Sequence, residues 1–281
     1  MERLAFTKMQ GNGNDFIVIA NWEGRFSDEA LRDLALDLCR RRLSIGADGL
    51  MVVEKSTKGD LRMRIFNRDG SEGEMCGNGA RCIARYAFEK GLAGENMVID
   101  TLAGPIGARV TPPYATLEMG TLKTADVARN QVFIFAGRKI RYSQLVVGVP
   151  HSVVFQDPGN ERSMEEPGAV ARAFQADRER FPVGTNVNFL KVTGQRDLDL
   201  RTYERGVDDF TLSCGTGSTA GAAAAWIEGL VQSPVAVQNP GGINTVLIEE
   251  EKPGILRLHL KGLTTIVAEG VCFDPAPRSL I

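Results

Sequence analysis

The sequence predicts an α+β protein made of two homologous domains, each a barrel or curled sheet of antiparallel strands around a central helix. Three observations predict this architecture: an internal repeat that covers most of the chain, short strand-like runs that dominate both halves, and a small number of helical patterns. A chain of 281 residues is also long enough to form two domains of common size.

The internal repeat sets the expected domain organisation. Segment 76–92 (CGNGARCIARYAFEKGL) matches segment 214–230 (CGTGSTAGAAAAWIEGL) without a gap at an offset of 138 residues. Three further pairs of segments follow in the same order: 64–70 with 202–208, 44–53 with 182–191, and 10–19 with 147–155. One glycine motif often matches by chance, but four in one register do not. We therefore expect domains over 1–128 and 129–281, and the sequence leaves open that the C-terminal tail packs on the first.

Short β-rich runs separated by Gly, Asn, Asp and Pro predict the strands. They include FIVIA, LMVVE, LRMRIF and NMVID in the first half, and VFIFA, SVVFQ, VNFLKV, LDLRTY and LRLHL in the second. Apolar residues at helical spacing predict a helix over 28–42, with an aspartate cap and basic residues at its end, and a partner over 166–178. Two more helices begin at the Cys-Gly-x-Gly turns and run to Gly91 and Gly229. Their apolar composition predicts central helices inside a shell of strands.

Charge and composition favour a small substrate over a polyanion. The 33 basic and 35 acidic residues give a net charge of −2, so the chain has no overall attraction to nucleic acid or anionic lipid. No apolar run approaches the roughly 20 residues that span a bilayer, and the start MERLAFTKMQ lacks the apolar region of a secretory signal. We expect a cytoplasmic protein with no nucleic-acid or membrane partner. The oligomeric state stays open, and a homodimer is one arrangement that the sequence allows.

The cysteines carry the first indication of chemistry. In a reducing compartment the five cysteines are expected to be thiols, each either a packed small side chain or a reactive group. Only two histidines are present, and Cys76 and Cys82 do not have CxxC spacing, so we expect no metal site. Cys76 and Cys214 differ from the other cysteines because each precedes a glycine-rich helix start.

Two such helix starts suit the inversion of one α-carbon. Glycines let the free N–H groups of a helix start approach a ligand, and the positive end of the helix favours both a carboxylate and a thiolate. Inversion removes a proton from one face of the carbon and returns one to the other face. Cys76 and Cys214, facing each other across a cleft between the domains, would do this as thiolate base and thiol acid. Backbone donors would stabilise the charge on the carboxylate, and no cofactor is required.

At these residues the sequence resembles the diaminopimelate epimerases, which belong to the PLP-independent epimerases and racemases. The blocks that carry the resemblance spread over nearly the whole chain: QGNGNDF (10–16), SIGADGL (44–50), FNRDGSEGEMCGNGARC (66–82), TLAG (101–104), GVPH (148–151), GTNV (184–187), YERG (203–206) and SCGTGS (213–218). The resemblance implies two pseudo-symmetric domains, each an antiparallel β-barrel around a central helix. It also implies interconversion of LL- and meso-2,6-diaminopimelate in lysine and peptidoglycan precursor biosynthesis.

The resemblance also implies a set of site residues. Cys76 and Cys214 match the catalytic bases of the family. The residues that match its substrate-binding side chains are Asn14, Asn67, Asn186, Glu204 and Arg205, and those expected to offer backbone N–H groups are Gly77, Asn78, Gly217 and Ser218. His151 is expected to support the thiol of Cys76. Val149 departs from the pattern, because the family usually has asparagine there, and this bears on which amino acid is bound.

Two kinds of alternative remain open at the level of the sequence. One is another racemase of the same fold, acting on histidine, proline or hydroxyproline. The polar set around Glu204 and Arg205 favours a substrate with a second amino-acid head, because a smaller substrate would leave these groups unpaired. The other is a non-catalytic protein that binds a small ligand, in which replacement of both cysteines would leave the function intact.

Overall fold

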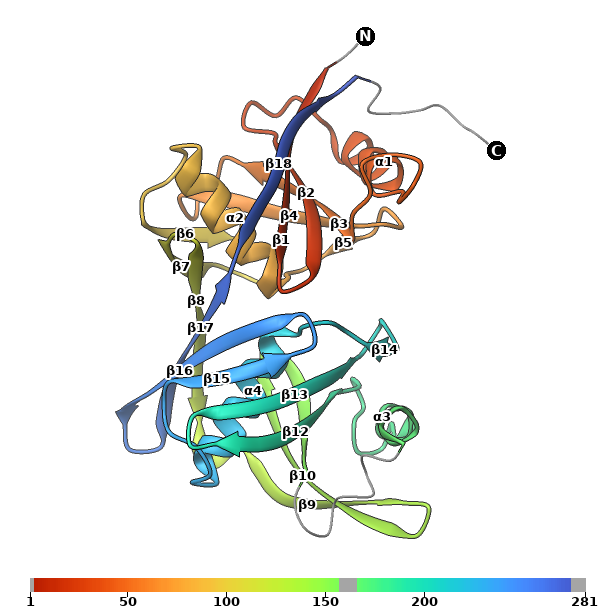
Figure 1. Cartoon of the computed structure of the whole chain (residues 1–281), viewed down its shortest axis with the longest axis vertical. Coiled ribbons are helices and arrows are strands. Elements are labelled where there is room, and N and C mark those ends of the chain that lie inside the picture. The colour runs from red at the N-terminus through yellow and green to blue at the C-terminus, as the bar shows by residue number, and fades with distance from the viewer. Residues whose placement is uncertain (1–2, 157–165, 274–281) are drawn as a thin grey trace. The chain divides into compact units, whose positions relative to one another are not determined.

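A computed structural model of the chain describes residues 3–156 and 166–273, and its contacts separate two compact units (Figure 1). Unit 1 comprises Met1–Leu117 and Gly262–Ile281, and unit 2 comprises Glu118–Lys261. The chain passes from unit 1 into unit 2 within strand β8 (Tyr114–Lys123) and returns within strand β17 (Ile255–Leu263).

These bounds differ from the expected division at 128/129 in two places. Residues 118–128 belong to unit 2, and the segment from Gly262 onward belongs to unit 1. The reason is strand pairing: β18 (Thr265–Cys272) forms an antiparallel ladder with β1 (Leu4–Gly11) at the other end of the chain. A pairing between residues more than 250 positions apart leaves no local signal in the sequence.

Unit 1 has one mixed sheet in which the strands pair in the order β18–β1–β2–β3–β4–β6–β7–β8, with β5 on β4. Its remaining elements are β2 (Asn14–Ala20), β3 (Gly49–Glu54), β4 (Leu61–Asn67), β5 (Glu72–Gly73), β6 (Asn96–Asp100), β7 (Ile106–Thr111), α1 (Asp28–Leu38) and α2 (Gly77–Glu89). The pairs β2–β3 and β4–β6 are parallel, and the others are antiparallel.

Unit 2 repeats this order as β9–β10–β11–β12–β13–β15–β16, with β14 on β13. Its elements are a short 3-10 helix (Thr124–Asp126), β9 (Ala128–Phe135), β10 (Arg138–Val147), β11 (Val149–Phe155), β12 (Asn186–Gly194), β13 (Asp197–Glu204), β14 (Asp209–Phe210), β15 (Val235–Asn239), β16 (Gly242–Lys252), α3 (Pro167–Ala176) and α4 (Gly215–Ile227). The parallel pairs β11–β12 and β13–β15 stand at the positions equivalent to those of unit 1.

The parallel pairs refine the expectation of antiparallel strands. Parallel neighbours need a crossover connection, and each pair has one that contains a helix. In unit 1, α1 lies between β2 and β3 along the chain, and α2 lies between β5 and β6. In unit 2, α3 and α4 occupy the same places in the order.

The central helix of each unit packs inside its own strands (Figure 1). Helix α2 contacts β1, β2, β3, β4, β6 and β7, and α4 contacts the equivalent strands β10, β11, β12, β13, β15 and β16. The expected α+β fold, with a central helix in each pseudo-symmetric half, is therefore confirmed. The buried residues of α4 are small, including Ala220 and Ala222–Ala225, so the strands can approach the helix closely.

The limits of the helices differ slightly from the expected ones. Helix α1 ends at Leu38, and its cap is Ser27, whose hydroxyl accepts the N–H of Ala30 at 3.3 Å. The chain leaves the helical path after this point, since Arg42 has a φ of 73°. Both central helices end just before Gly91 and Gly229, whose positive φ values of 66° and 72° reverse the chain. No helix among the described residues is long and apolar enough to cross a membrane.

Candidate active site

Cys76 is the N-cap of the central helix in unit 1. Its backbone is extended (φ −135°, ψ 119°), and the helix begins at the next residue, Gly77. The side chain is partly exposed, and its thiol donates to Asn14 Oδ1 at 3.6 Å. The N–H groups of Gly77 and Asn78 lie in the first turn of α2, at the positive end of the helix. Unit 1 therefore combines a thiol with backbone donors at the positive end of a helix.

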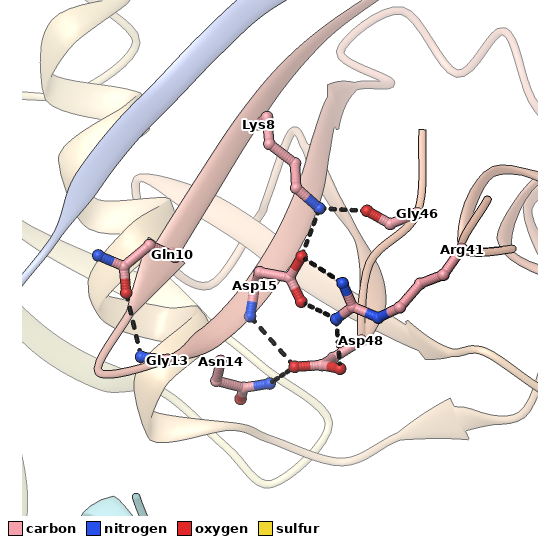
Figure 2. A network of polar contacts seen from close by, with 8 residues as sticks. All are labelled: Lys8, Gln10, Gly13, Asn14, Asp15, Arg41, Gly46 and Asp48. Atoms are coloured by element: carbon pink, nitrogen blue, oxygen red, sulfur yellow. Dashed lines mark hydrogen bonds and ion pairs between the residues drawn. The ribbon is translucent and has the colours of Figure 1, made fainter. Parts of the chain in front are cut away.

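A network of charged groups orients Asn14 (Figure 2). Asn14 Nδ2 donates to Asp48 Oδ2 at 2.8 Å, which leaves its carbonyl oxygen directed at the Cys76 thiol. Arg41 Nη2 binds Asp48 Oδ1 at 3.0 Å and also pairs with Asp15. Burial raises the pKa of Asp15, but the ammonium of Lys8, 2.6 Å from Asp15 Oδ2, and the guanidinium of Arg41 lower it by more, so its pKa lies below the ordinary value. The network thus joins two carboxylates to two basic side chains.

Asn67 lies at the end of β4 and is exposed. Its Nδ2 donates to Ser71 Oγ at 3.0 Å, and its N–H donates to the carbonyl of Ser71, so the asparagine closes a tight turn. A side chain held at its base and exposed at its tip can still bind a ligand. The expected role of Asn67 in substrate binding stays a prediction.

Cys214 is the N-cap of the central helix in unit 2, at the position equivalent to Cys76. Its sulfur accepts the N–H of Gly217 at 3.4 Å and lies 3.4 Å from Thr216 Oγ1. The side chain is buried. Burial raises the pKa of the Cys214 thiol well above its ordinary value, and the neighbouring charge of Glu204 raises it further. This cysteine is therefore held as a thiol at neutral pH.

Glu204 ends strand β13 beside this thiol. Its carboxylate accepts a hydrogen bond from the hydroxyl of Thr211 at 2.6 Å. Burial raises the pKa of Glu204, and its interactions with Thr211 and Cys214 partly oppose that rise. The structure thus brings Cys214 and Glu204 together as a thiol–carboxylate pair.

Asn186 and Arg205 also meet in unit 2. Asn186 begins β12 and is buried, and its Oδ1 accepts the backbone N–H of Arg205 at 2.8 Å. The Arg205 guanidinium donates to the carbonyl of Val183 through Nη1 and is exposed. Its remaining N–H groups can bind a carboxylate through a bidentate fork.

The expectation for Gly217 and Ser218 needs correction. The N–H of Gly217 points to the Cys214 sulfur, and the N–H of Ser218 donates to the carbonyl of Cys214 at 2.9 Å. Both donors are therefore used within the helix start, because an α-helix satisfies its N–H groups from the fourth residue after the cap. The donors of this turn without an intrahelical carbonyl belong to Gly215 and Thr216.

His151 lies on β11 and is fully buried in unit 2. Its Nδ1 meets Asn188 Nδ2 at 3.1 Å, and the register of β11 with β12 sets it opposite Asn186. Burial lowers the pKa of His151 to about 3, so the imidazole is neutral at physiological pH. Its expected link to Cys76 stays a prediction.

Sequence reasoning missed several residues that support the two cysteines. In unit 2, Thr216 and Thr211 contact the thiol–carboxylate pair, and Asn188 contacts His151. In unit 1, Asp48 holds Asn14, and the repeat offered a signal for it because Asp48 aligns with Asn186. Among the described residues, no group of three or more His, Cys, Asp or Glu side chains is arranged to hold a metal ion.

Known proteins with similar sequences are diaminopimelate epimerases. The family model "Diaminopimelate epimerase" matches residues 6–124 and 144–258. A diaminopimelate epimerase of Archaeoglobus fulgidus is 42% identical over 279 residues, which cover 92% of this chain and 98% of the relative. That of Methanothrix thermoacetophila is 36% identical over 290 residues and covers both chains completely.

Solved structures share the fold at low sequence identity. A Bacillus anthracis phenazine biosynthesis protein of the PhzF family has a TM-score of 0.71 at 15% identity, over 97% of this chain and 100% of that one. A hydroxyproline epimerase from Agrobacterium vitis has a TM-score of 0.65 at 16% identity, over 96% and 92%. Since the family model covers most of the sequence and full-length relatives exceed 30% identity, the chain belongs to the diaminopimelate epimerase family.

Proposed function

We propose that this protein interconverts LL- and meso-2,6-diaminopimelate by proton transfer between the α-carbon and two cysteines, without a cofactor. The observation that carries the mechanism is the position of Cys76 and Cys214 at equivalent helix starts in two repeated units, each with a polar partner. The family relationship supports the substrate.

The reaction needs one group that accepts a proton and one that supplies it. The Cys214 thiol is buried against Glu204, which keeps it protonated and ready to donate. The Cys76 thiol is more accessible and lies at the positive end of α2, which favours the thiolate that accepts the α-proton. After transfer, Cys76 is a thiol and Cys214 a thiolate, so the reverse reaction uses the same pair with exchanged roles.

The carboxylate next to the reacting carbon gains charge as the α-proton leaves. The backbone N–H groups in the first turns of the two helices, at Gly77 and Asn78 in α2 and at Gly215 and Thr216 in α4, are suited to stabilise that charge. Arg205 and the asparagines Asn67 and Asn186 are suited to bind the distal amino-acid head of diaminopimelate through charge and paired donor and acceptor groups.

We also propose that the protein works in the cytoplasm on a small amino acid. All five cysteines are free thiols in the structure, which supports a reducing compartment. The nearly balanced net charge of −2 supports a small substrate rather than a polyanionic partner.

The test follows the α-proton. The reduced protein is incubated with LL-diaminopimelate in deuterated water, the α-proton is followed by NMR, and the stereoisomers are resolved. We expect deuterium to appear together with the meso isomer, and Cys76→Ala and Cys214→Ala each to abolish the conversion. The matched control is Cys272→Ala, which removes a partly exposed thiol on β18 and should retain activity.

Two results would contradict the proposal. Turnover in either Cys76→Ala or Cys214→Ala would exclude the two-base mechanism. Absence of exchange with diaminopimelate, together with exchange of proline, hydroxyproline or histidine, would assign the protein to another racemase activity of this fold.

A further inference from the structure

A buried arginine lies in the central helix of unit 1, five residues after Cys76. Arg81 has no exposed surface and is one of the largest fully buried side chains of the described residues. Its Nη2 donates to Asn78 Oδ1 at 2.8 Å, whereas Nε and Nη1 have no hydrogen-bond partner among the residues that the structure describes. No carboxylate is paired with it in that part of the chain. An isolated buried cation is costly, so a group that can carry the opposite charge is expected nearby.

The strands around α2 leave room for this guanidinium. A Cβ atom built on Gly262 would lie 2.6 Å from Arg81 Nε and 2.7 Å from Cζ, so a larger residue there would force the guanidinium to move. On β1, a Cβ built on Gly11 would lie 3.7 Å from Arg81 Nη2 and 3.5 Å from the Cys82 sulfur. The arginine therefore lies in a space shaped by two glycines, and not on the solvent side of the helix.

The ionisable groups that act on Arg81 are two thiols. Burial lowers the pKa of Arg81, and ionisation of Cys82 or Cys76 would favour its protonated form. Cys82 is fully buried, and burial raises its pKa to about 12, so it remains a neutral thiol. Cys76 is partly exposed at the helix start, a setting that favours a thiolate, whereas the Asn14 carbonyl accepts a hydrogen bond from its protonated form, so the charge of Arg81 acts against that hydrogen bond.

Most of the other charged side chains around α2 have oppositely charged partners. The pairs are Lys8 and Arg41 with Asp15, Arg41 with Asp48, Arg64 with Asp28, Glu54 and Glu72, Arg109 with Glu95, and Lys90 with Glu269. Asp100 accepts a hydrogen bond from Ser56, and Arg62 lies opposite Glu54 in the β3–β4 ladder. Arg81 is thus a cation that these groups do not neutralise.

The repeat shows that the two helix starts have opposite electrostatic surroundings. The residue of unit 2 at the position of Arg81 is Thr219, which donates to the carbonyl of Gly215 at 2.9 Å and carries no charge. The residue of unit 1 at the position of Glu204 is Phe66, which is fully buried. One cysteine therefore has a buried cation in its unit and the other has a carboxylate.

We propose that Arg81 is a positioning residue whose buried guanidinium favours the thiolate form of Cys76 and makes Cys76 the base of the resting protein. The thiolate then accepts the α-proton as the Cys214 thiol donates its own, so one proton is taken up and one released, and Cys214 becomes the thiolate. The use of this thiolate rests on the proposed function, but its formation requires no substrate.

The experiment measures the ionisation of Cys76 directly. The full-length reduced protein is alkylated with iodoacetamide between pH 5 and pH 10, and the rate at Cys76 is read from its peptide by mass spectrometry. An ordinary cysteine thiol has a pKa of about 8.5. In the wild-type protein we expect the midpoint of the rate–pH profile for Cys76 to lie below this value. Arg81→Met should slow alkylation at pH 7 by about tenfold or more, which corresponds to a shift of about one pH unit in the midpoint.

Two variants separate charge from packing. Arg81→Lys keeps the positive charge and should retain most of the wild-type profile. Thr219→Val alters the equivalent position of α4 and should leave the Cys76 profile unchanged. Urea unfolding of each variant shows whether the fold is intact, and a purely structural role would change unfolding without moving the midpoint.

A wild-type midpoint at or above that of an ordinary thiol would overturn the proposal whether or not any variant folds. A folded Arg81→Met protein with the wild-type profile would also overturn it. The profile is read without substrate, so its failure is distinct from a failure of deuterium exchange, which tests the proposed function.

Discussion

An added methyl group at Gly217 in helix α4 would meet two side chains of the neighbouring strands. Built on this residue, a Cβ atom would lie 2.5 Å from Asn188 Oδ1 and 2.7 Å from Thr202 Oγ1, well inside ordinary contact distance. Those two oxygens are joined by a buried hydrogen bond of 2.9 Å. Gly217→Ala therefore forces β12 and β13 away from the helix or breaks that hydrogen bond.

The change in the free energy of unfolding of Gly217→Ala combines two destabilising effects and one stabilising effect. Overpacking of a close-packed core costs about 1–3 kcal/mol. A buried polar group that loses its partner costs a further 1–3 kcal/mol or so. Alanine in place of glycine in a helix returns about 1 kcal/mol. Together these terms predict that the free energy of unfolding of Gly217→Ala falls by about 1–5 kcal/mol.

Gly79→Ala is the matched control, because Gly79 occupies the equivalent position in α2. Its Cβ would meet Met51 Cε at 2.7 Å and Sδ at 3.1 Å, which form the end of a flexible side chain. That end can rotate away, so we expect a change within about 1 kcal/mol. Urea unfolding followed by circular dichroism measures both variants. Equal stability of Gly217→Ala and wild type, or a larger loss in Gly79→Ala, would refute the reasoning.

Three further predictions concern the site. Asp48→Ala removes the acceptor that orients Asn14, and we expect kcat/KM to fall about tenfold, the equivalent of one hydrogen bond to a charged group. Burial lowers the pKa of His151 from 6.5 to about 3, so between pH 6.5 and pH 3 the unfolded chain takes up a proton that the folded protein does not. The stability of the wild type therefore falls as the pH decreases through this range, and His151→Gln should flatten that dependence. Glu204→Gln removes a negative charge beside Cys214, so the pKa of that thiol should fall and its alkylation at pH 8 should accelerate.

Each of these has a control on the same chain. Glu23→Ala removes a carboxylate from an exposed pair with Lys55 and should leave kcat/KM unchanged. His259→Gln, on β17, is the histidine control for the pH dependence. An unchanged kcat/KM for Asp48→Ala would show that Asn14 needs no such support. A pH profile of His151→Gln that overlays the wild type would show that other groups determine acid stability, and an unchanged alkylation rate in Glu204→Gln would show that burial alone holds the Cys214 proton.

The repeat explains how much of the fold could be predicted. The starts of both central helices at Cys76 and Cys214 depend on glycines and apolar spacing within a few residues, so local sequence determined them. The parallel pairs and the pairing of β18 with β1 depend on partners far along the chain, and only the assembled sheet decides those.

By itself the sequence determined the domain repeat, the central helices and the two cysteines at their starts, because each is encoded in a short window or its copy 138 residues away. The tertiary structure alone decided the electrostatics that distinguish these cysteines. The sequence gives no sign that Arg81, a charged residue on a helix, is buried, whereas in the folded chain it lies against Gly11 and Gly262, which come from opposite ends of the sequence. The effect of a charge depends on its distance from other groups and on its exclusion from water, and folding sets both.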